Sequence, residues 1–156
     1  AKDVATPADQ AFDILHAAGQ IPGISDEQRQ TVAKIREEIH QAVLVLQAEK
    51  LQQKYESLVA EADKLLADVK VLADYSEVEK QYQEATQLEV ADRGAAQDGL
   101  KKCRRLRIHF LFEEGDQFAA MNNWGDAVGC YKKILFVHSA DPEDKKTAEE
   151  KIIYCR

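Results

Sequence analysis

The run from Ser25 to Tyr75, which contains neither glycine nor proline, constrains the fold more than any other feature of the chain. Glycine and proline are the residues that most often interrupt a helix, so this run can form one long helix. Its apolar residues recur at alternating spacings of three and four, which is the heptad pattern of helices that pack along a seam. The seam consists of Val32, Ile35, Ile39, Ala42 and Leu46, then, after a phase slip, Leu51, Tyr55, Leu58, Ala62, Leu65, Val69 and Leu72. The sequence predicts a helix over residues 26–73 that packs along this seam.

A first, shorter helix is predicted near the beginning of the sequence. Thr6 supplies a capping hydroxyl, Pro7 suits the first helical position, and Asp9 stands at the third position. The helix should end at Gly19, because glycine is favoured just past the last helical turn.

Further start signals divide the remaining chain. Ser25 opens a capping-box pattern at the head of the long helix, and Ser76 opens another one after it. Residues 92–99 contain two glycines and predict a loop or a frayed kink. Asp141 precedes a proline and two acids, which predicts a final helix.

Together these signals predict an all-α chain. The expected architecture is a long antiparallel helical hairpin, coiled-coil-like, that leads into a helix-turn-helix and a final helix. Its three segments are a short helix and loop (1–24), a long helical region (25–100) and a C-terminal helical module (101–156), joined in one continuous body.

Residues 113–135 differ in composition from the rest of the chain. Gly115 and Ala127 lack bulk, which would let two helices cross closely. Phe118 and Tyr131 would fill the space beside this crossing. The Asn122-Asn123 pair suits a tight turn between the helices. Trp124 would then cover the turn from the start of the second helix.

This spacing resembles the tetratricopeptide (TPR) repeat, a helix-turn-helix unit of about 34 residues with fixed glycine, aromatic and alanine positions. The resemblance covers about residues 108–141, and no preceding repeat is visible. Leu111 and Glu114 replace the pattern's tryptophan and leucine, and Ser139 stands at its proline position. The helix from Pro142 would be either the first helix of a next repeat or a capping helix.

The resemblance implies a non-enzymatic protein–protein interaction or scaffold module. TPR proteins bind partner segments along the concave side of the first helices of their repeats. The matching positions here are His109, Phe112, Asp116 and Ala119. An acid and an aromatic disfavour a clamp for a C-terminal carboxylate, so an apolar or basic protein or peptide segment is the expected partner.

A second interpretation makes the long helix a structural spacer or an oligomerisation element. Its seam would then pack against another chain, with self-association along Leu51–Leu72. Internal closure as a hairpin is favoured, because the residues after Tyr75 carry an apolar stripe of their own.

Charge argues against nucleic acid as a partner. The net charge is −7, which favours a soluble protein, although Lys101–Arg107 holds five basic residues in seven. No aromatic stacking platform accompanies them, and pairing with acids such as Glu49, Glu56 or Glu61 is expected instead.

No catalytic, metal or cofactor motif is recognised, so no enzyme is predicted. His109 and Glu113 are spaced to share a metal, but no second such pair accompanies them. Cys103, Cys130 and Cys155 are expected to be buried free thiols, which favours a reducing compartment such as the cytoplasm. No apolar run is long enough for a membrane span.

Overall fold

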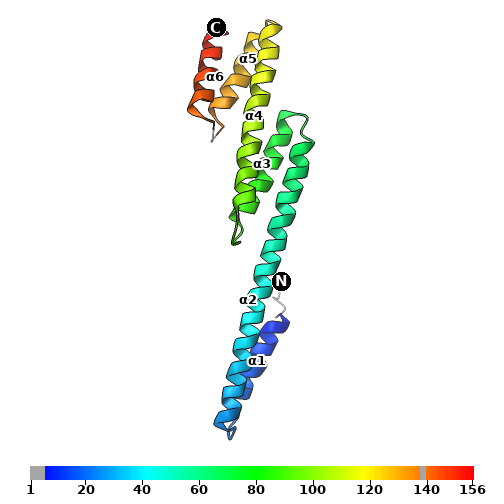
Figure 1. Cartoon of the computed structure of the whole chain (residues 1–156), viewed down its shortest axis with the longest axis vertical. Coiled ribbons are helices and arrows are strands. Elements are labelled where there is room, and N and C mark those ends of the chain that lie inside the picture. The colour runs from blue at the N-terminus through cyan, green and yellow to red at the C-terminus, as the bar shows by residue number, and fades with distance from the viewer. Residues whose placement is uncertain (1–5, 138–139) are drawn as a thin grey trace. The chain divides into compact units, whose positions relative to one another are not determined.

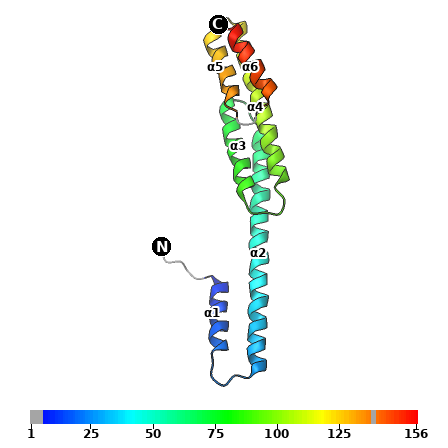
Figure 2. The ribbon, with the colours of Figure 1, turned by 90° about the vertical axis from the view of Figure 1, so that its left-hand side faces the viewer.

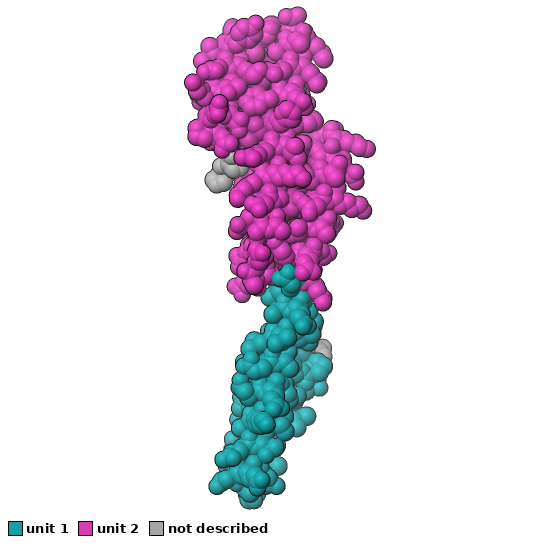
Figure 3. All heavy atoms as spheres, in the orientation of Figure 1, with its two compact units in different colours: residues 1–52 teal, residues 53–156 magenta. Residues whose placement is uncertain are grey.

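The computed structural model describes residues 6–137 and 140–156, and within them the chain forms six α-helices and no strand (Figure 1). The all-α prediction and the long central helix are therefore confirmed. Ser139 lies outside the described residues. The helices are α1 (Pro7–Gly19), α2 (Asp26–Ala67), α3 (Leu72–Gln87), α4 (Gly94–Ala120), α5 (Trp124–Leu135) and α6 (Pro142–Tyr154). Contacts group the chain into two compact units, residues 1–52 and 53–156, with the boundary inside α2 (Figure 3).

In the first unit, both predicted helix starts are confirmed. The Thr6 hydroxyl accepts a hydrogen bond from the Asp9 backbone N–H at 3.3 Å, and the Asp9 carboxylate accepts one from the Thr6 N–H at 2.9 Å. Ser25 and Gln28 exchange the same pair of bonds at the start of α2. These caps satisfy backbone donors that have no partner within the helix.

The two helices of this unit run antiparallel, side by side in both ribbon views (Figures 1 and 2). The ring of Phe12 meets the edge of His40 at a centroid distance of 6.1 Å, and Gly19 lies near Val32 at the other end. Among residues 6–52 no side chain is fully buried. This unit is therefore a helical pair without a closed core.

The end of α2 corrects the sequence prediction. α2 ends at Ala67 rather than at residue 73, although neither glycine nor proline stands there. The Asp74 carboxylate accepts hydrogen bonds from the backbone N–H groups of Lys70 and Val71, at 3.0 and 3.1 Å, and so stabilises a new helix start at Leu72. The same bonds lower the pKa of Asp74. The start predicted at Ser76 was wrong, because Ser76 lies inside α3.

A second correction concerns the following loop. The chain turns at residues 88–93, and α4 already begins at Gly94, so most of the predicted 92–99 loop is helical. Gly99 is needed there for packing, since a Cβ at this position would overlap the ring of Tyr82 on α3. The Tyr82 hydroxyl in turn donates to the Asp63 carboxylate on α2.

The second unit is built around α4, which takes part in two successive helix clusters. Its first half packs with α3 and the end of α2, and its second half packs with α5 and α6 (Figure 2). The buried residues of the α2–α4 clusters are Tyr55, Ala62, Leu66, Tyr75, Val78, Tyr82, Ala85, Ala96 and Cys103. Those of the α4–α6 cluster are Ile108, Leu111, Ala127, Cys130, Tyr131, Ile134, Val137, Ala140, Ala148 and Ile152. The heptad seam from Tyr55 to Leu72 thus packs within the chain itself.

Candidate functional site

The crossing of α4 and α5 lies next to the candidate site and fixes the position of Phe112 through Tyr131. Gly115 and Ala127 are both buried there, and a Cβ on Gly115 would lie 2.5 Å from Cε1 of Tyr131. Such a distance is well inside van der Waals contact, so the Tyr131 ring occupies the space that a side chain at Gly115 would need. Asn122, with φ of 61°, makes the tight turn between the helices, in the left-handed region that asparagine tolerates.

Tyr131 then connects α4, α5 and α6. Its hydroxyl donates to the Asp116 carboxylate at 2.6 Å, and the Lys151 ammonium of α6 donates to the same oxygen at 2.6 Å. Burial favours the protonated carboxyl of Asp116, but the bonds from Lys151 and Tyr131 outweigh it and lower its pKa. The ring of Phe112 lies against Tyr131 with a centroid distance of 6.3 Å. Phe112 is therefore held by the residue that fills the crossing.

A groove opens beside Phe112 between α4 and the beginning of α6. It has a volume of about 280 Å³ and continues into a neighbouring hollow of about 340 Å³. The lining residues of this α4–α6 groove are Arg105, Ile108, His109 and Phe112 on α4, with Asp141 just before α6 and Asp144 on α6. Asp98 and Lys101 line the neighbouring hollow, which shares Arg105 and Asp141.

The structure divides the four predicted partner-binding residues into two pairs. His109 and Phe112 line the α4–α6 groove, with His109 exposed and 3.2 Å from the Glu113 carboxylate. Asp116 is engaged by Tyr131 and Lys151, and the half-buried Ala119 packs against the α4–α6 cluster. Neither Asp116 nor Ala119 is among the groove's lining residues.

Not all of the predicted crossing residues lie at the crossing itself. Gly115, Ala127 and Tyr131 meet at the crossing, and the half-buried Phe118 packs against the same cluster. Trp124 is 39% exposed, and its ring meets Tyr154 of α6 edge-on at 6.4 Å. Trp124 thus contacts the end of α6.

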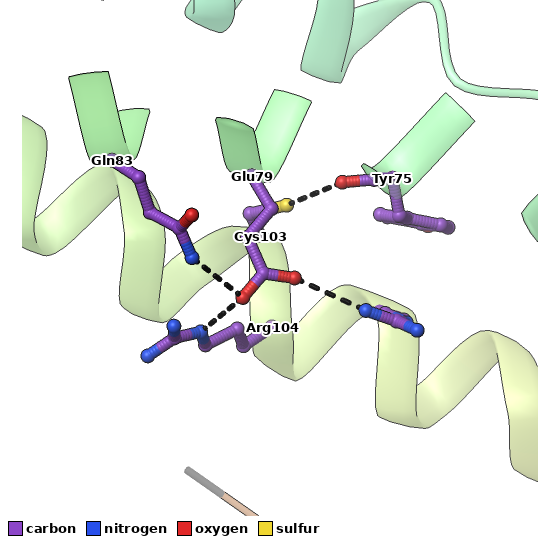
Figure 4. Close-up of polar contacts among 6 residues, drawn as sticks. Tyr75, Glu79, Gln83, Cys103 and Arg104 are labelled. Carbon is purple, nitrogen blue, oxygen red and sulfur yellow. Dashed lines mark hydrogen bonds and ion pairs between the residues drawn. The ribbon is translucent and has the colours of Figure 1, made fainter. Parts of the chain in front are cut away.

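The basic run on α4 pairs with an acid of α3 that the sequence did not single out. Arg104 and Arg107 donate to the two carboxylate oxygens of Glu79 at 2.7 and 3.1 Å, and Gln83 donates to the same group (Figure 4). The Glu79 side chain is only 16% exposed. Two of the five positive charges therefore form ion pairs between α4 and α3.

The thiols at the helix contacts are poor nucleophiles. Burial raises the pKa of Cys103 to about 11, with a further contribution from Glu79, and its thiol donates to the Tyr75 carbonyl. Burial and the hydrogen bond to Glu114 raise the pKa of Cys130 to about 11 as well. A reactive cysteine needs the opposite environment, one that stabilises the thiolate.

Within the described residues, no three His, Cys, Asp or Glu side chains gather as metal ligands would. None of the helices that the structure describes is long and apolar enough to cross a membrane.

Residues Ile108, Asp141 and Asp144 of the groove were not identified from the sequence as site residues. The sequence pattern predicts a helix start at Asp141, and Asp141 does precede α6 as its N-cap. Its side chain makes no capping hydrogen bond, however. The sequence carries no signal that these acids line the same groove as Phe112, about thirty residues away, because the packing of α6 in the α4–α6 cluster decides that placement.

No protein-family model, curated protein or solved structure matches the chain.

Proposed function

We propose that this protein is a non-enzymatic protein–protein interaction module that binds a partner segment in the α4–α6 groove. The observation that carries the proposal is a half-buried aromatic side chain, Phe112, beside two carboxylates, Asp141 and Asp144, in one groove. No hydrogen bond or ion pair is shown for either carboxylate within the described residues. The helical scaffold supports the proposal through its likeness to a TPR unit, with the second half of α4 and α5 as the helix pair.

The groove indicates the chemistry of the partner. An apolar side chain can pack on Ile108 and Phe112, where water is already partly excluded. A lysine or arginine next to it can pair with Asp141 or Asp144. Asp116 is a weaker candidate for this pairing, because Lys151 already neutralises it. The preferred partner is thus a segment with adjacent apolar and basic residues.

A peptide-display selection against the intact protein tests the proposal. We expect enriched peptides that combine an apolar residue with Lys or Arg, and binding weakened by about tenfold or more in Phe112→Ala. Phe136→Ala is the matched control, because Phe136 is 86% exposed and lies outside the groove. Asp141→Asn with Asp144→Asn should weaken binding, whereas Glu143→Gln with Glu149→Gln on the same helix should not. If the selected peptides bind the Phe112→Ala variant as tightly as they bind the unaltered protein, the α4–α6 groove is not the binding site.

A second candidate function, oligomerisation through the long helix, is supported by one observation. Leu44, Val45 and Leu46 are 46, 58 and 51% exposed, which leaves an apolar stretch of α2 open to solvent. Sedimentation velocity tests it: Leu44→Lys with Leu46→Lys should convert a dimer into a monomer. If the unaltered protein is monomeric at all concentrations, oligomerisation through the long helix is excluded.

A further inference from the structure

A second groove lies in the first unit, between α1 and the first half of α2. It has a volume of about 560 Å³. The lining residues of this α1–α2 groove are Phe12, Leu15, His16, Gly19 and Gln20 on the α1 side, with Arg29, Val32, Ala33, Arg36, Glu37 and His40 on α2. Its apolar floor is formed by Phe12, Leu15 and Val32, all of them half-buried.

The packing of this unit leaves its apolar side chains partly exposed. Two helices in contact need a closed apolar seam to hold their geometry, and no described residue of 6–52 is fully buried. A third helix laid along the groove would cover Phe12, Leu15 and Val32 together. The groove is not enclosed, which suits a helix better than a small ligand that must be enclosed.

The charges at the groove edge indicate which helix fits. Arg29 and Arg36 lie one heptad apart on the flank of the seam, the position from which charged residues select partners in helix bundles. No ion pair is shown for either guanidinium within the described part of the chain. Glu37, the one acid of the lining, already accepts a hydrogen bond from the Gln41 amide at 2.9 Å. The flank therefore offers two positive charges at heptad spacing.

We propose that the α1–α2 groove docks an amphipathic helix of a protein partner. The apolar stripe of that helix covers Phe12, Leu15 and Val32. Two of its acidic residues, seven positions apart, pair with Arg29 and Arg36. This is a second binding site with its own partner chemistry, since the α4–α6 groove presents two carboxylates and Arg105, whereas the α1–α2 groove presents two arginines and Glu37.

Two synthetic peptides and the intact protein test this proposal. Both peptides are helical, about three heptads long, with the same leucine stripe. One carries Glu at the flanking heptad positions, and the other carries Lys. By fluorescence anisotropy we expect the Glu peptide to bind at least about tenfold more tightly than the Lys peptide.

Charge reversal supplies the decisive comparison. The double variant Arg29→Glu with Arg36→Glu should bind the Glu peptide about tenfold more weakly than the unaltered protein does. It should bind the Lys peptide more tightly. The matched control is Lys34→Glu with Lys50→Glu, which makes the same charge change on α2 outside the groove. Phe112→Ala should leave binding of the Glu peptide unchanged, which separates this site from the α4–α6 groove. A variant that merely unfolds would lose affinity for both peptides. It could not come to prefer the Lys peptide over the Glu peptide.

Three results would overturn the proposal. One is equal affinity for the two peptides, and another is Glu-peptide binding that survives Val32→Glu in the groove floor. The third is occupation of the groove by something else. A second copy would be revealed if Val32→Glu turned a dimer into a monomer. A lipid surface would be revealed if the protein bound phosphatidylglycerol vesicles through Arg29 and Arg36 but did not bind the Glu peptide.

Discussion

Two tyrosines occupy equivalent places at the two crossings of α4. Tyr82 lies against Gly99 and Tyr131 against Gly115, and each hydroxyl donates to a carboxylate, Asp63 in one case and Asp116 in the other. Burial and the bond to the carboxylate raise the pKa of both phenols, so both remain donors at neutral pH. A glycine on α4 and a tyrosine on the crossing helix thus form one contact that is used twice.

This contact gives a prediction for Gly115→Ala. The new methyl group would overlap Tyr131, which is 1% exposed and cannot move without losing its bond to Asp116. We expect a loss of about 1–3 kcal/mol in the free energy of unfolding, measured by urea denaturation. Gly129→Ala on α5 is the control, because a Cβ there would meet no atom within 4 Å, and it should be neutral or stabilising by up to about 1 kcal/mol. Equal effects of the two variants would contradict the close crossing.

The thiols give a second prediction at this scale. With a pKa of about 11, Cys103 and Cys130 are almost entirely protonated at pH 8, and both are buried. Iodoacetamide should therefore modify the half-buried Cys155 first, with Cys103 and Cys130 reacting at a comparable rate only in urea. Mass spectrometry of the digested protein measures the order. Rapid labelling of Cys103 in the native protein would contradict it and would reopen a catalytic role.

The same shift has a consequence for stability at high pH. The thiols ionise near 9 when exposed and near 11 when folded, so protonated thiols favour the folded state. The contribution of the protonated thiols to the free energy of unfolding is complete below pH 9 and is lost as the pH rises from about 9 to about 11.

At the scale of elements, Glu79 is the polar link between α3 and α4. Its carboxylate receives both Arg104 and Arg107, which are 16 and 27% exposed, next to the buried Cys103. Surface ion pairs contribute little to stability, but removal of one member of a largely buried group leaves its partners unpaired.

We therefore expect Glu79→Gln to lower the free energy of unfolding by about 1–3 kcal/mol. The control is Asp98→Asn, which breaks the exposed ion pair between Asp98 and Lys101 on α4. It should lower the free energy of unfolding by less than about 0.5 kcal/mol. Urea denaturation of both variants measures the difference. An effect of Glu79→Gln no larger than that of Asp98→Asn would show that the α3–α4 contact is purely apolar.

For the whole molecule, the two units differ in how they are stabilised. Residues 53–156 contain all of the fully buried side chains that the structure describes, whereas the described part of 1–52 contains none. Hydrophobic burial is the main favourable term in folding, so the second unit holds most of the stability.

We predict that a fragment of residues 53–156 folds cooperatively and that a fragment of residues 1–52 is at most partly helical. Circular dichroism and urea titration of the two fragments measure this. In the intact chain, hydrogen exchange should be fast in α1 and the first half of α2, and slow in α4 and α5. A cooperative transition of the 1–52 fragment at micromolar concentration would contradict the prediction.

The sequence by itself determined the helical class, the long helix and three of the helix starts. These features depend on local chemistry: the absence of glycine and proline, the heptad spacing, the caps at Thr6 and Ser25, and the proline and acids that follow Asp141. The small residues at Gly115 and Ala127 also indicated where two helices could cross. All of these signals lie within one or two turns of the residues that they affect.

Only the tertiary structure decided where α2 ends, what Gly99 does and which residues face Phe112. The Asp74 cap replaces a break that glycine or proline would have marked, and Gly99 is explained only by a tyrosine of another helix. The groove acids Asp141 and Asp144 lie at the start of α6, which α5 separates from Phe112 in the sequence. Such placements depend on how helices pack over long sequence distances, which no local pattern encodes.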